Sequence, residues 1–170
     1  MNIIIDTREK PKAIEKIVKE FDLQGIKYVR SKLFCGDYQS WDNARLVIDR
    51  KQDLQELCGN VCQQHERFKN ELIRAIEQGI KIVILCEHGK DIGSIDDVLL
   101  WQNPRRTMVR WKTINGKKVK EVVSAKAVNG DQLYKSLCTI RDRYNVEFVF
   151  CNKNETGKKI IEILGGTYDS

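Results

Sequence analysis

The chain lacks any long apolar run. No stretch of 18 consecutive apolar residues occurs among its 170 residues, and this excludes a transmembrane helix. The opening residues, MNIIIDTREKPK, contain an apolar stretch that is far too short for a secretory signal peptide. Internal repeats and low-complexity tracts are missing too. We therefore expect one domain, residues 1–170, in the cytoplasm and without membrane contact.

A complete zinc-binding pattern is also missing. Cys58 and Cys62 lie four residues apart on a predicted helix, and His65 follows, which could form half of a zinc site. No CxxC or HxxxH pair occurs to complete it. Most of the six cysteines lie in apolar runs such as residues 82–86, where a free thiol behaves as a small hydrophobic group. The pattern favours buried thiols over a zinc site.

The sequence does contain an alternation of short β-prone runs and helical patterns. Hydrophobic residues make up 41% and charged residues 32%, a balance typical of a globular chain that can bury a core. We expect strands at residues 2–5, 26–33, 36–38, 46–48, 81–86 and 146–151. We expect helices at residues 11–24, 54–78 (with a break near Gly59 and Asn60), from 94 onward, 132–144 and 156–164. This order predicts an α/β fold with a mixed central sheet flanked by helices.

One segment carries the excess of positive charge. Residues 104–126 hold eight basic residues and one acid, a net +7; because the whole chain is +6, the other 147 residues sum to −1. Asn115-Gly116 between two β-prone runs predicts a β-hairpin here. An inserted basic β-hairpin indicates a polyanion-binding element, although a solvated hairpin without a partner would have the same composition.

The alternation along this hairpin predicts two different faces. Arg110 and Lys112 share one side of the first strand, and Val109 and Trp111 share the other. On the second strand we expect a row made by Lys118 and Lys120. We therefore expect one basic face, and one apolar face that packs on the body of the protein.

Charged residues also gather at the end of one predicted strand. Asp49 and Lys51 are two apart on an extended segment, so their side chains leave the same face. Asp37 lies on the neighbouring strand, where pairing can bring it beside Asp49. Two adjacent carboxylates repel unless a cation lies between them, and Mg²⁺ prefers carboxylate, water and phosphate oxygens. The pattern predicts a metal site for phosphodiester hydrolysis in which Lys51 stabilises phosphate charge or orients water. The spacing of these three residues fits equally well with an exposed hairpin whose acidic and basic side chains pair with one another.

Three ordered motifs resemble the nuclease domain of the XPF family of structure-selective DNA endonucleases. They are I-I-D-T-R-E at residues 4–9, G-D-Y at 36–38 and V-I-D-R-K at 47–51. The segment H-E-R-F-K-N-E-L at 65–72 resembles the family's Arg-aromatic helix. Later segments resemble small bacterial and phage members: W-Q-N-P-R-R (101–106), F-V-F-C (148–151) and T-G-K-K-I-I-E-I-L (156–164).

The resemblance implies a restriction-endonuclease-like core with metal ligands at Asp37 and Asp49 and a catalytic lysine at Lys51. Asp6 and Arg8 would support the metal or the scissile phosphate. The implied enzyme is a Mg²⁺- or Mn²⁺-dependent endodeoxyribonuclease. It would act on branched or flap DNA in replication, recombination or repair, in the cytoplasm of a bacterial or phage-infected cell.

Two further expectations follow from the resemblance. Arg50 is included among the catalytic residues through its backbone carbonyl, because neighbouring strand residues point in opposite directions. A homodimer is expected because members of the family tend to dimerise.

The chain departs from the family's pattern at three places. The glutamate of the family's E-R-K motif is Asp49, one methylene shorter. The aspartate that follows the lysine is Gln55, with Asp53 and Glu56 nearby, and any of the three could take its supporting role. A helix-hairpin-helix DNA-binding domain does not occur before Ser170. We therefore expect the basic hairpin to hold DNA, through Arg105, Arg106, Arg110, Lys112, Lys117, Lys118 and Lys120.

Two other functions stay open on the sequence. One is a catalytically inactive DNA-binding subunit of the same fold, against which the intact Asp37, Asp49 and Lys51 argue. The other is a protein-interaction module of a phage or mobile-element replication complex, with the hairpin bound to an acidic partner.

Overall fold

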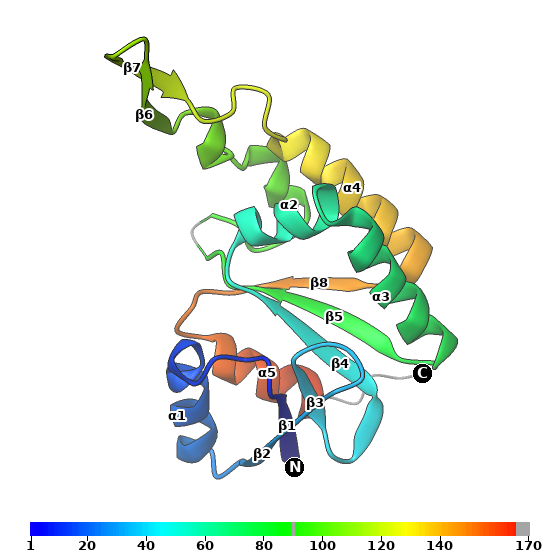
Figure 1. Ribbon diagram of the computed structural model, residues 1–170. Helices are drawn as coiled ribbons and strands as arrows, with labels where there is room; N and C mark the ends of the chain where they lie inside the picture. The colour runs from blue at the N-terminus through cyan, green and yellow to red at the C-terminus, as the bar shows by residue number, and fades with distance from the viewer. Residues whose placement is uncertain (90, 166–170) are drawn as a thin grey trace.

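The computed structural model describes residues 1–89 and 91–165. Its centre is a six-stranded mixed sheet with strand order β2-β1-β3-β4-β5-β8 (Figure 1). Strand β3 is antiparallel to both of its neighbours, and the other neighbouring pairs are parallel. The strands of this sheet are β1 (Asn2–Asp6), β2 (Lys27–Ser31), β3 (Tyr38–Ser40), β4 (Asn43–Lys51), β5 (Lys81–Cys86) and β8 (Glu147–Phe150).

Helices cover both faces of the sheet. In Figure 1, α2, α3 and α4 lie over one face, and α1 and α5 lie over the other. Their bounds are α1 (Glu15–Leu23), α2 (Leu54–Cys62), α3 (His65–Glu77), α4 (Gly130–Tyr144) and α5 (Thr156–Gly165), with short 3₁₀ helices η1 (Pro11–Ala13), η2 (Asp96–Leu100) and η3 (Pro104–Arg106). A mixed sheet between helices confirms the predicted α/β fold class.

The core lies on both sides of β5, which explains its continuous apolar sequence. Ile82 and Ile84 pack with α2, α3 and α4. Val83 and Leu85 point the other way and pack with α1 and α5. Because both faces of the strand are covered, β5 is apolar on both sides from Ile82 to Cys86.

The helical segment predicted at residues 54–78 is two helices, and its break lies later than expected. The Gly59 carbonyl accepts hydrogen bonds from the backbone N–H groups of Gln63 and Gln64, at 2.9 and 3.0 Å. These bonds close α2 four residues beyond the glycine, so the chain turns between Cys62 and His65. The helix predicted from residue 94 is the shorter η2, preceded by a turn in which the Asp97 carboxylate accepts from the Ser94 backbone at 2.8 Å.

A separate two-stranded sheet, β6 (Val109–Ile114) and β7 (Lys117–Val122), projects from the body as an arm (Figure 1). We use "the arm" for residues 108–123. Asn115 and Gly116 form its turn with positive φ angles of 46° and 77°, as a type I′ turn requires. The predicted hairpin is therefore confirmed.

The prediction of one basic and one apolar face on the arm is wrong. Trp111 pairs with Lys120, and Thr113 pairs with Lys118, so these lysines share the face of the tryptophan. The other face carries Arg110 and Lys112 together with apolar residues. The two-residue turn pairs odd-numbered residues of β6 with even-numbered residues of β7. Basic and apolar side chains that were expected on opposite faces therefore lie on the same face. Neither face packs on the body: every residue of β6 is exposed, and all of β7 except the half-buried Glu121.

The two ends of the arm are fastened together at its base by Asn103. Its buried side chain accepts from the Arg105 backbone at 3.1 Å and donates to the Val128 carbonyl at 2.8 Å. The Ser124 backbone N–H donates to the Arg105 carbonyl at 3.0 Å, and the Arg106 guanidinium donates to Ala127 at 2.8 Å. The insertion thus leaves and rejoins the body at one clamped point.

All six cysteines are free thiols, and four of them are buried: Cys35, Cys58, Cys86 and Cys151. No helix among residues 1–89 and 91–165 is long and apolar enough to cross a bilayer.

Candidate active site

The end of β4 presents charged side chains to both faces of the sheet. Asp49 and Lys51 point toward the layer of α2 and α3, and the Lys51 ammonium contacts the Asp49 carboxylate at 2.7 Å. Arg50 lies between them in sequence and points to the opposite face. All three are buried, as expected for a strand inside the sheet.

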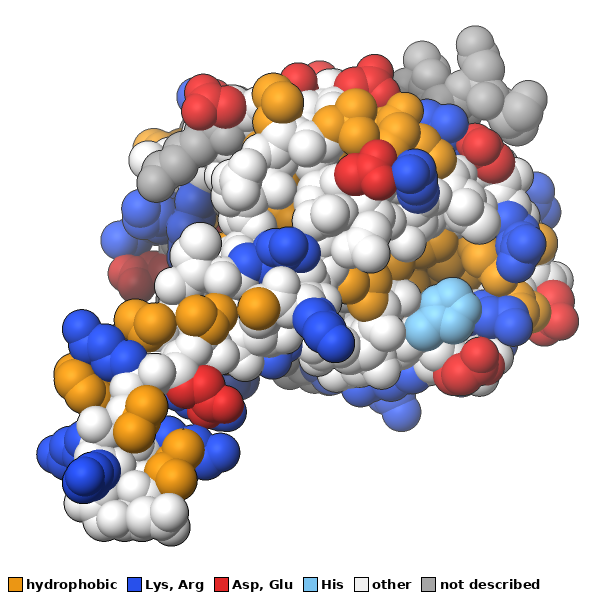
Figure 2. All heavy atoms as spheres, turned by 90° about the horizontal axis from the view of Figure 1, so that it is seen from above, with side chains coloured by type: hydrophobic (Ala, Val, Ile, Leu, Met, Phe, Trp, Pro, Cys, Tyr) orange, Lys and Arg blue, Asp and Glu red, His pale blue; other side chains and the backbone are white. Residues whose placement is uncertain are grey.

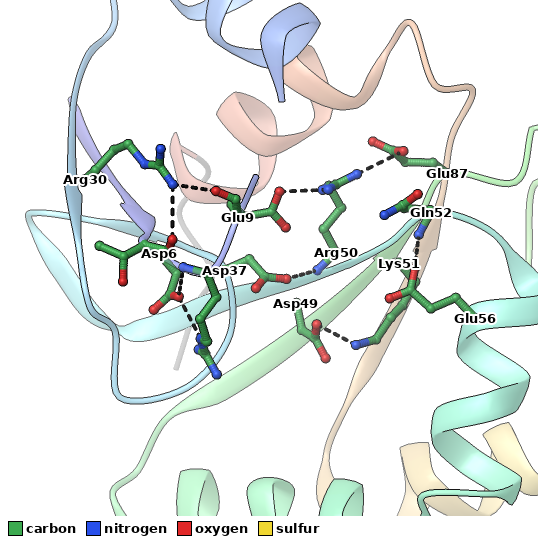
Figure 3. A network of polar contacts seen from close by, with 12 residues as sticks. Asp6, Glu9, Arg30, Asp37, Asp49, Arg50, Lys51, Gln52, Glu56 and Glu87 are labelled. Carbon is green, nitrogen blue, oxygen red and sulfur yellow. Dashed lines mark hydrogen bonds and ion pairs between the residues drawn. The ribbon is translucent and has the colours of Figure 1, made fainter. Parts of the chain in front are cut away.

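Asp37 lies beside this strand end, immediately before β3. Its backbone N–H donates to the Ile48 carbonyl at 2.7 Å, and its carboxylate accepts from the Arg50 backbone N–H at 2.9 Å. Gly36 permits this approach: it has φ +68°, and a Cβ there would come 3.0 Å from the Ile48 oxygen. The carboxylates of Asp37 and Asp49 therefore lie next to each other, as Figure 3 shows.

The acidic and basic groups around Asp37 shift one another's pKa values. Burial, and then the charge of Asp49, raise the pKa of the Asp37 carboxyl to about 8, against the opposing hydrogen bond from Arg50. Burial acts most strongly and lowers the pKa of Lys51, but the charge and hydrogen bond of Asp49 together with the charges of Asp37 and Glu56 outweigh it, so that pKa is raised. The ammonium also lies 5.8 Å from the centre of the Phe68 ring. The Lys51 ammonium thus interacts with the two adjacent carboxyl groups of Asp37 and Asp49.

The Arg50 guanidinium belongs to a buried charge network on the other face of β4. It donates to Glu9 at 2.7 Å and forms an ion pair with Glu87 at 3.1 Å that lacks hydrogen-bond geometry (Figure 3). The expected opposite directions of adjacent side chains are therefore observed. The contact of Arg50 with the Asp37 carboxylate is made by its backbone.

Asp6 and Arg8 lie at the end of strand β1, which pairs with β3. The fully buried Asp6 carboxylate accepts from the Arg8 backbone at 2.8 Å, the Arg8 guanidinium at 2.7 Å and the Leu33 backbone at 2.7 Å. Burial acts to raise the pKa of Asp6, but these hydrogen bonds outweigh it and hold the pKa below its usual value. The Arg8 guanidinium also reaches the Gly36 carbonyl at 3.1 Å. Asp6 therefore fixes Arg8 at the rim of the site, close to Asp37.

These groups open into a pocket of about 400 Å³ between the strand ends and helices α2 and α3. Several of its lining residues were not predicted as site residues: Gln52, Asn60, Gln64, Arg67, Phe68 and Glu71. Glu71 accepts from the Gly36 backbone at 3.4 Å. The available signal was the segment at residues 65–72, in which Arg67, Phe68 and Glu71 fall on one side of a helix.

The structure distinguishes the three residues that could replace the family's later aspartate. Asp53 accepts from the Glu56 backbone at 2.7 Å and so caps the start of α2. Gln55 lines a neighbouring groove rather than this pocket. Glu56 lines the pocket, where its carboxylate accepts from the Gln52 backbone at 2.8 Å. Of these three residues, Glu56 is the one that lies at this pocket.

The donor set fits a hard divalent cation bound mostly by non-protein oxygens. Over residues 1–89 and 91–165, no three His, Cys, Asp or Glu side chains converge on a possible metal position. Asp37 and Asp49 supply two adjacent carboxylates whose mutual repulsion a cation would relieve. Mg²⁺ is commonly held by one or two carboxylates, with water and phosphate oxygens completing its shell.

The sheet order, with paired carboxylates and a lysine at adjoining strand ends, defines a restriction-endonuclease-like fold. The ERCC4 domain family matches residues 5–163, so the chain belongs to that family, and the predicted resemblance to the XPF nuclease domain is confirmed. No curated protein sequence matches the chain.

Solved structures of XPF from Aeropyrum pernix share this fold. One has a TM-score of 0.61 at 11% identity, and another, a complex with DNA, has a TM-score of 0.60 at 14% identity. In both, the alignment covers 96% of this chain and 63% of the other. The chain thus spans less than two thirds of that protein.

Proposed function

We propose that the protein is a divalent-metal-dependent DNA endonuclease. The observation that carries this proposal is the convergence of Asp37, Asp49 and Lys51 on one pocket, in a chain of the ERCC4 domain family. Two carboxylates and a lysine at adjoining strand ends suit phosphodiester hydrolysis, because they combine a cation site with a fixed ammonium.

Each residue has a separate role in this proposal. Asp37 and Asp49 hold Mg²⁺ or Mn²⁺, which when bound supplies a water of lowered pKa and polarises the phosphate. Lys51 stabilises negative charge on the phosphate, since its ammonium is kept charged by Asp49. Arg8 contacts the scissile phosphate from the rim, and Asp6 positions Arg8. Arg50 positions Asp37 through its backbone N–H.

DNA would be held by the arm and its base. A body that is nearly neutral and a projecting segment that is strongly basic favour a polyanion bound at the arm. The structure of Aeropyrum pernix XPF with DNA supports DNA as that polyanion. The resemblance favours branched or flap DNA, in bacterial or phage replication, recombination or repair.

The test is a cleavage assay with fluorescent fork, flap and linear duplex DNA in the presence of Mn²⁺ or Mg²⁺. The wild type should cut branched substrates, and Asp49→Asn should cut at least about 100-fold more slowly. The Asn variant should bind DNA as tightly as the wild type or slightly more tightly, because it removes a negative charge that faces the phosphate backbone. Binding without cleavage by the wild type would instead indicate an inactive DNA-binding subunit.

A further inference from the structure

Trp111 is an exposed aromatic residue in the middle of the basic arm. Its side chain is 64% exposed. The register places Lys120 opposite it and Lys118 one pair further along the same face. The Lys120 ammonium lies 5.2 Å from the centre of the indole ring, so a cation–π contact orients the ring.

The arm exposes more apolar surface than phosphate binding requires. Exposed apolar side chains occur on both of its faces, and on the side seen in Figure 2 apolar side chains are interleaved with lysines and arginines along the arm. They are Met108, Val109, Trp111, Ile114, Val119 and Val122. Cations alone would suffice to neutralise phosphates, whereas interleaved apolar and basic groups match the interleaved bases and phosphates of an unpaired strand.

The catalytic pocket adjoins a second groove that reaches the base of the arm. This groove, of about 670 Å³, runs along α2 and shares Gln52 and Glu56 with the catalytic pocket. Its far side is formed by Arg105 and Lys126, at the base of the arm. A strand that crosses the catalytic pocket can therefore follow this groove toward Trp111.

We propose that Trp111 stacks on an unpaired nucleobase, with Lys118 and Lys120 contacting the phosphates beside it. In an intact duplex each base is covered by its neighbours, so only unpaired nucleotides offer a free ring face. Trp111 then makes the arm selective for single-stranded segments over duplex. This inference rests on the proposed function, since it specifies which part of the DNA the arm holds.

The test compares matched variants in binding assays with EDTA, where no cleavage occurs. The probes are labelled dT16 and a blunt 16-base-pair duplex. Trp111→Ala should weaken dT16 binding by about 10-fold or more, the loss expected for one stacked base, and should change duplex binding by less than about twofold. Trp111→Phe should retain most of the affinity for dT16. The control is Trp41→Ala, because Trp41 is 63% exposed but lies at the β3–β4 turn.

Fluorescence gives a direct readout of stacking. In a Trp41→Phe background the exposed indole is that of Trp111, since Trp101 is buried. Binding of dT16 should quench this emission, because a stacked base contacts the ring. Inorganic polyphosphate, which has the charge but no bases, should bind without such quenching. Equal quenching by both ligands would overturn the stacking role.

Equal affinity of the wild type and Trp111→Ala for dT16 would also overturn the inference. If light scattering of that variant then shows a shift from dimer to monomer, the indole is assigned to contact with a second copy. A wild type that binds dT16 through Trp111 but never cleaves DNA would refute the proposed nuclease activity alone.

Discussion

Asp37 combines burial with a neighbouring carboxylate, and this combination makes the metal-free protein sensitive to pH. Its pKa is about 8 in the folded chain and 3.8 as an ordinary aspartate. Between these values the folded state holds a proton that the unfolded state has released. The free energy of unfolding therefore falls as the pH rises from about 4 to about 8.

We predict that Asp37→Asn removes this dependence. Without metal, the variant should gain stability relative to the wild type as the pH is raised from 5 to 8.5, because the amide carries no charge to repel Asp49. Urea unfolding in EDTA at both pH values measures the difference. The exposed Asp42→Asn serves as the control. A stability difference that is the same at pH 5 and pH 8.5 would contradict the raised pKa.

Lys51 should matter for cleavage rather than for metal binding. Lys51→Met keeps a chain of similar length that can pack on Phe68 but removes the ammonium beside Asp49. Cleavage should fall by about 100-fold or more, while Mn²⁺ affinity is retained or increased, since both carboxylates lose their competing cation. Calorimetric titration with Mn²⁺ separates the two effects, and Lys19→Met, at an exposed position, is the control. Loss of the metal site in Lys51→Met would refute this division of roles.

At the scale of elements, β4 carries proposed catalytic residues on one face and a buried charge network on the other. Arg50→Leu would leave Glu9 and Glu87 buried without their shared cation. We predict a loss of about 3–5 kcal/mol in the free energy of unfolding, measured by urea denaturation. Arg141→Leu, which removes a surface arginine paired with Asp142, should leave the unfolding midpoint unchanged.

A triple variant tests whether the uncompensated charges cause that loss. Glu9→Gln and Glu87→Gln, added to Arg50→Leu, leave no buried charge in the network and should recover part of the stability. If the triple variant is less stable than Arg50→Leu, the loss comes from packing instead.

The arm should control the dependence of DNA binding on salt. Serine at Arg110, Lys112, Lys118 and Lys120 removes basic groups from both faces of the ribbon. Each lost phosphate contact lowers the salt slope by about one, so we predict a decrease of roughly two to four. Arg110 should contribute least, because it is paired with Glu121 at 3.1 Å. Titrations at several salt concentrations measure the slope. An affinity and a slope equal to those of the wild type would show that the arm is not part of the DNA-binding surface.

The elements that could be predicted are those specified by neighbouring residues. The apolar run of β5 and the Asn115-Gly116 turn each determine their own structure, and both were predicted. The faces of the arm were not, because they depend on which residues pair across the turn. The end of α2 was misplaced for a similar reason: the Gly59 carbonyl closes the helix several residues after the glycine.

In the candidate site too, features set by nearby residues could be predicted and features set by distant packing could not. Asp37, Asp49 and Lys51 were brought together by strand spacing and pairing, which are local rules. Glu71 could not be placed, because its position depends on how α3 packs against the sheet. The buried partners of Arg50 come from segments far apart in the sequence, and no single motif joins Glu9 with Glu87.

At the scale of the whole molecule, the fold should form without a metal ion. Apolar layers on both faces of the sheet stabilise it, and the proposed metal ligands lie at the edge of those layers. We predict that EDTA leaves the far-ultraviolet circular dichroism spectrum unchanged while it abolishes cleavage. Mn²⁺ added back should restore activity and raise the melting temperature. Unfolding in EDTA would show that the metal is structural.

The expected homodimer is tested on the same scale by light scattering across a range of protein concentrations. A constant mass equal to one chain at all concentrations would contradict it.

The clamp at Asn103 has a consequence for how this chain can change. Because both ends of the arm meet at one hydrogen-bonded point, the length of chain between them is independent of the sheet's geometry. Residues can be added, removed or exchanged there without moving the strand ends that carry Asp37 and Asp49. The position is thus a natural graft point, at which a different segment, or a reporter domain, can be joined to the same body.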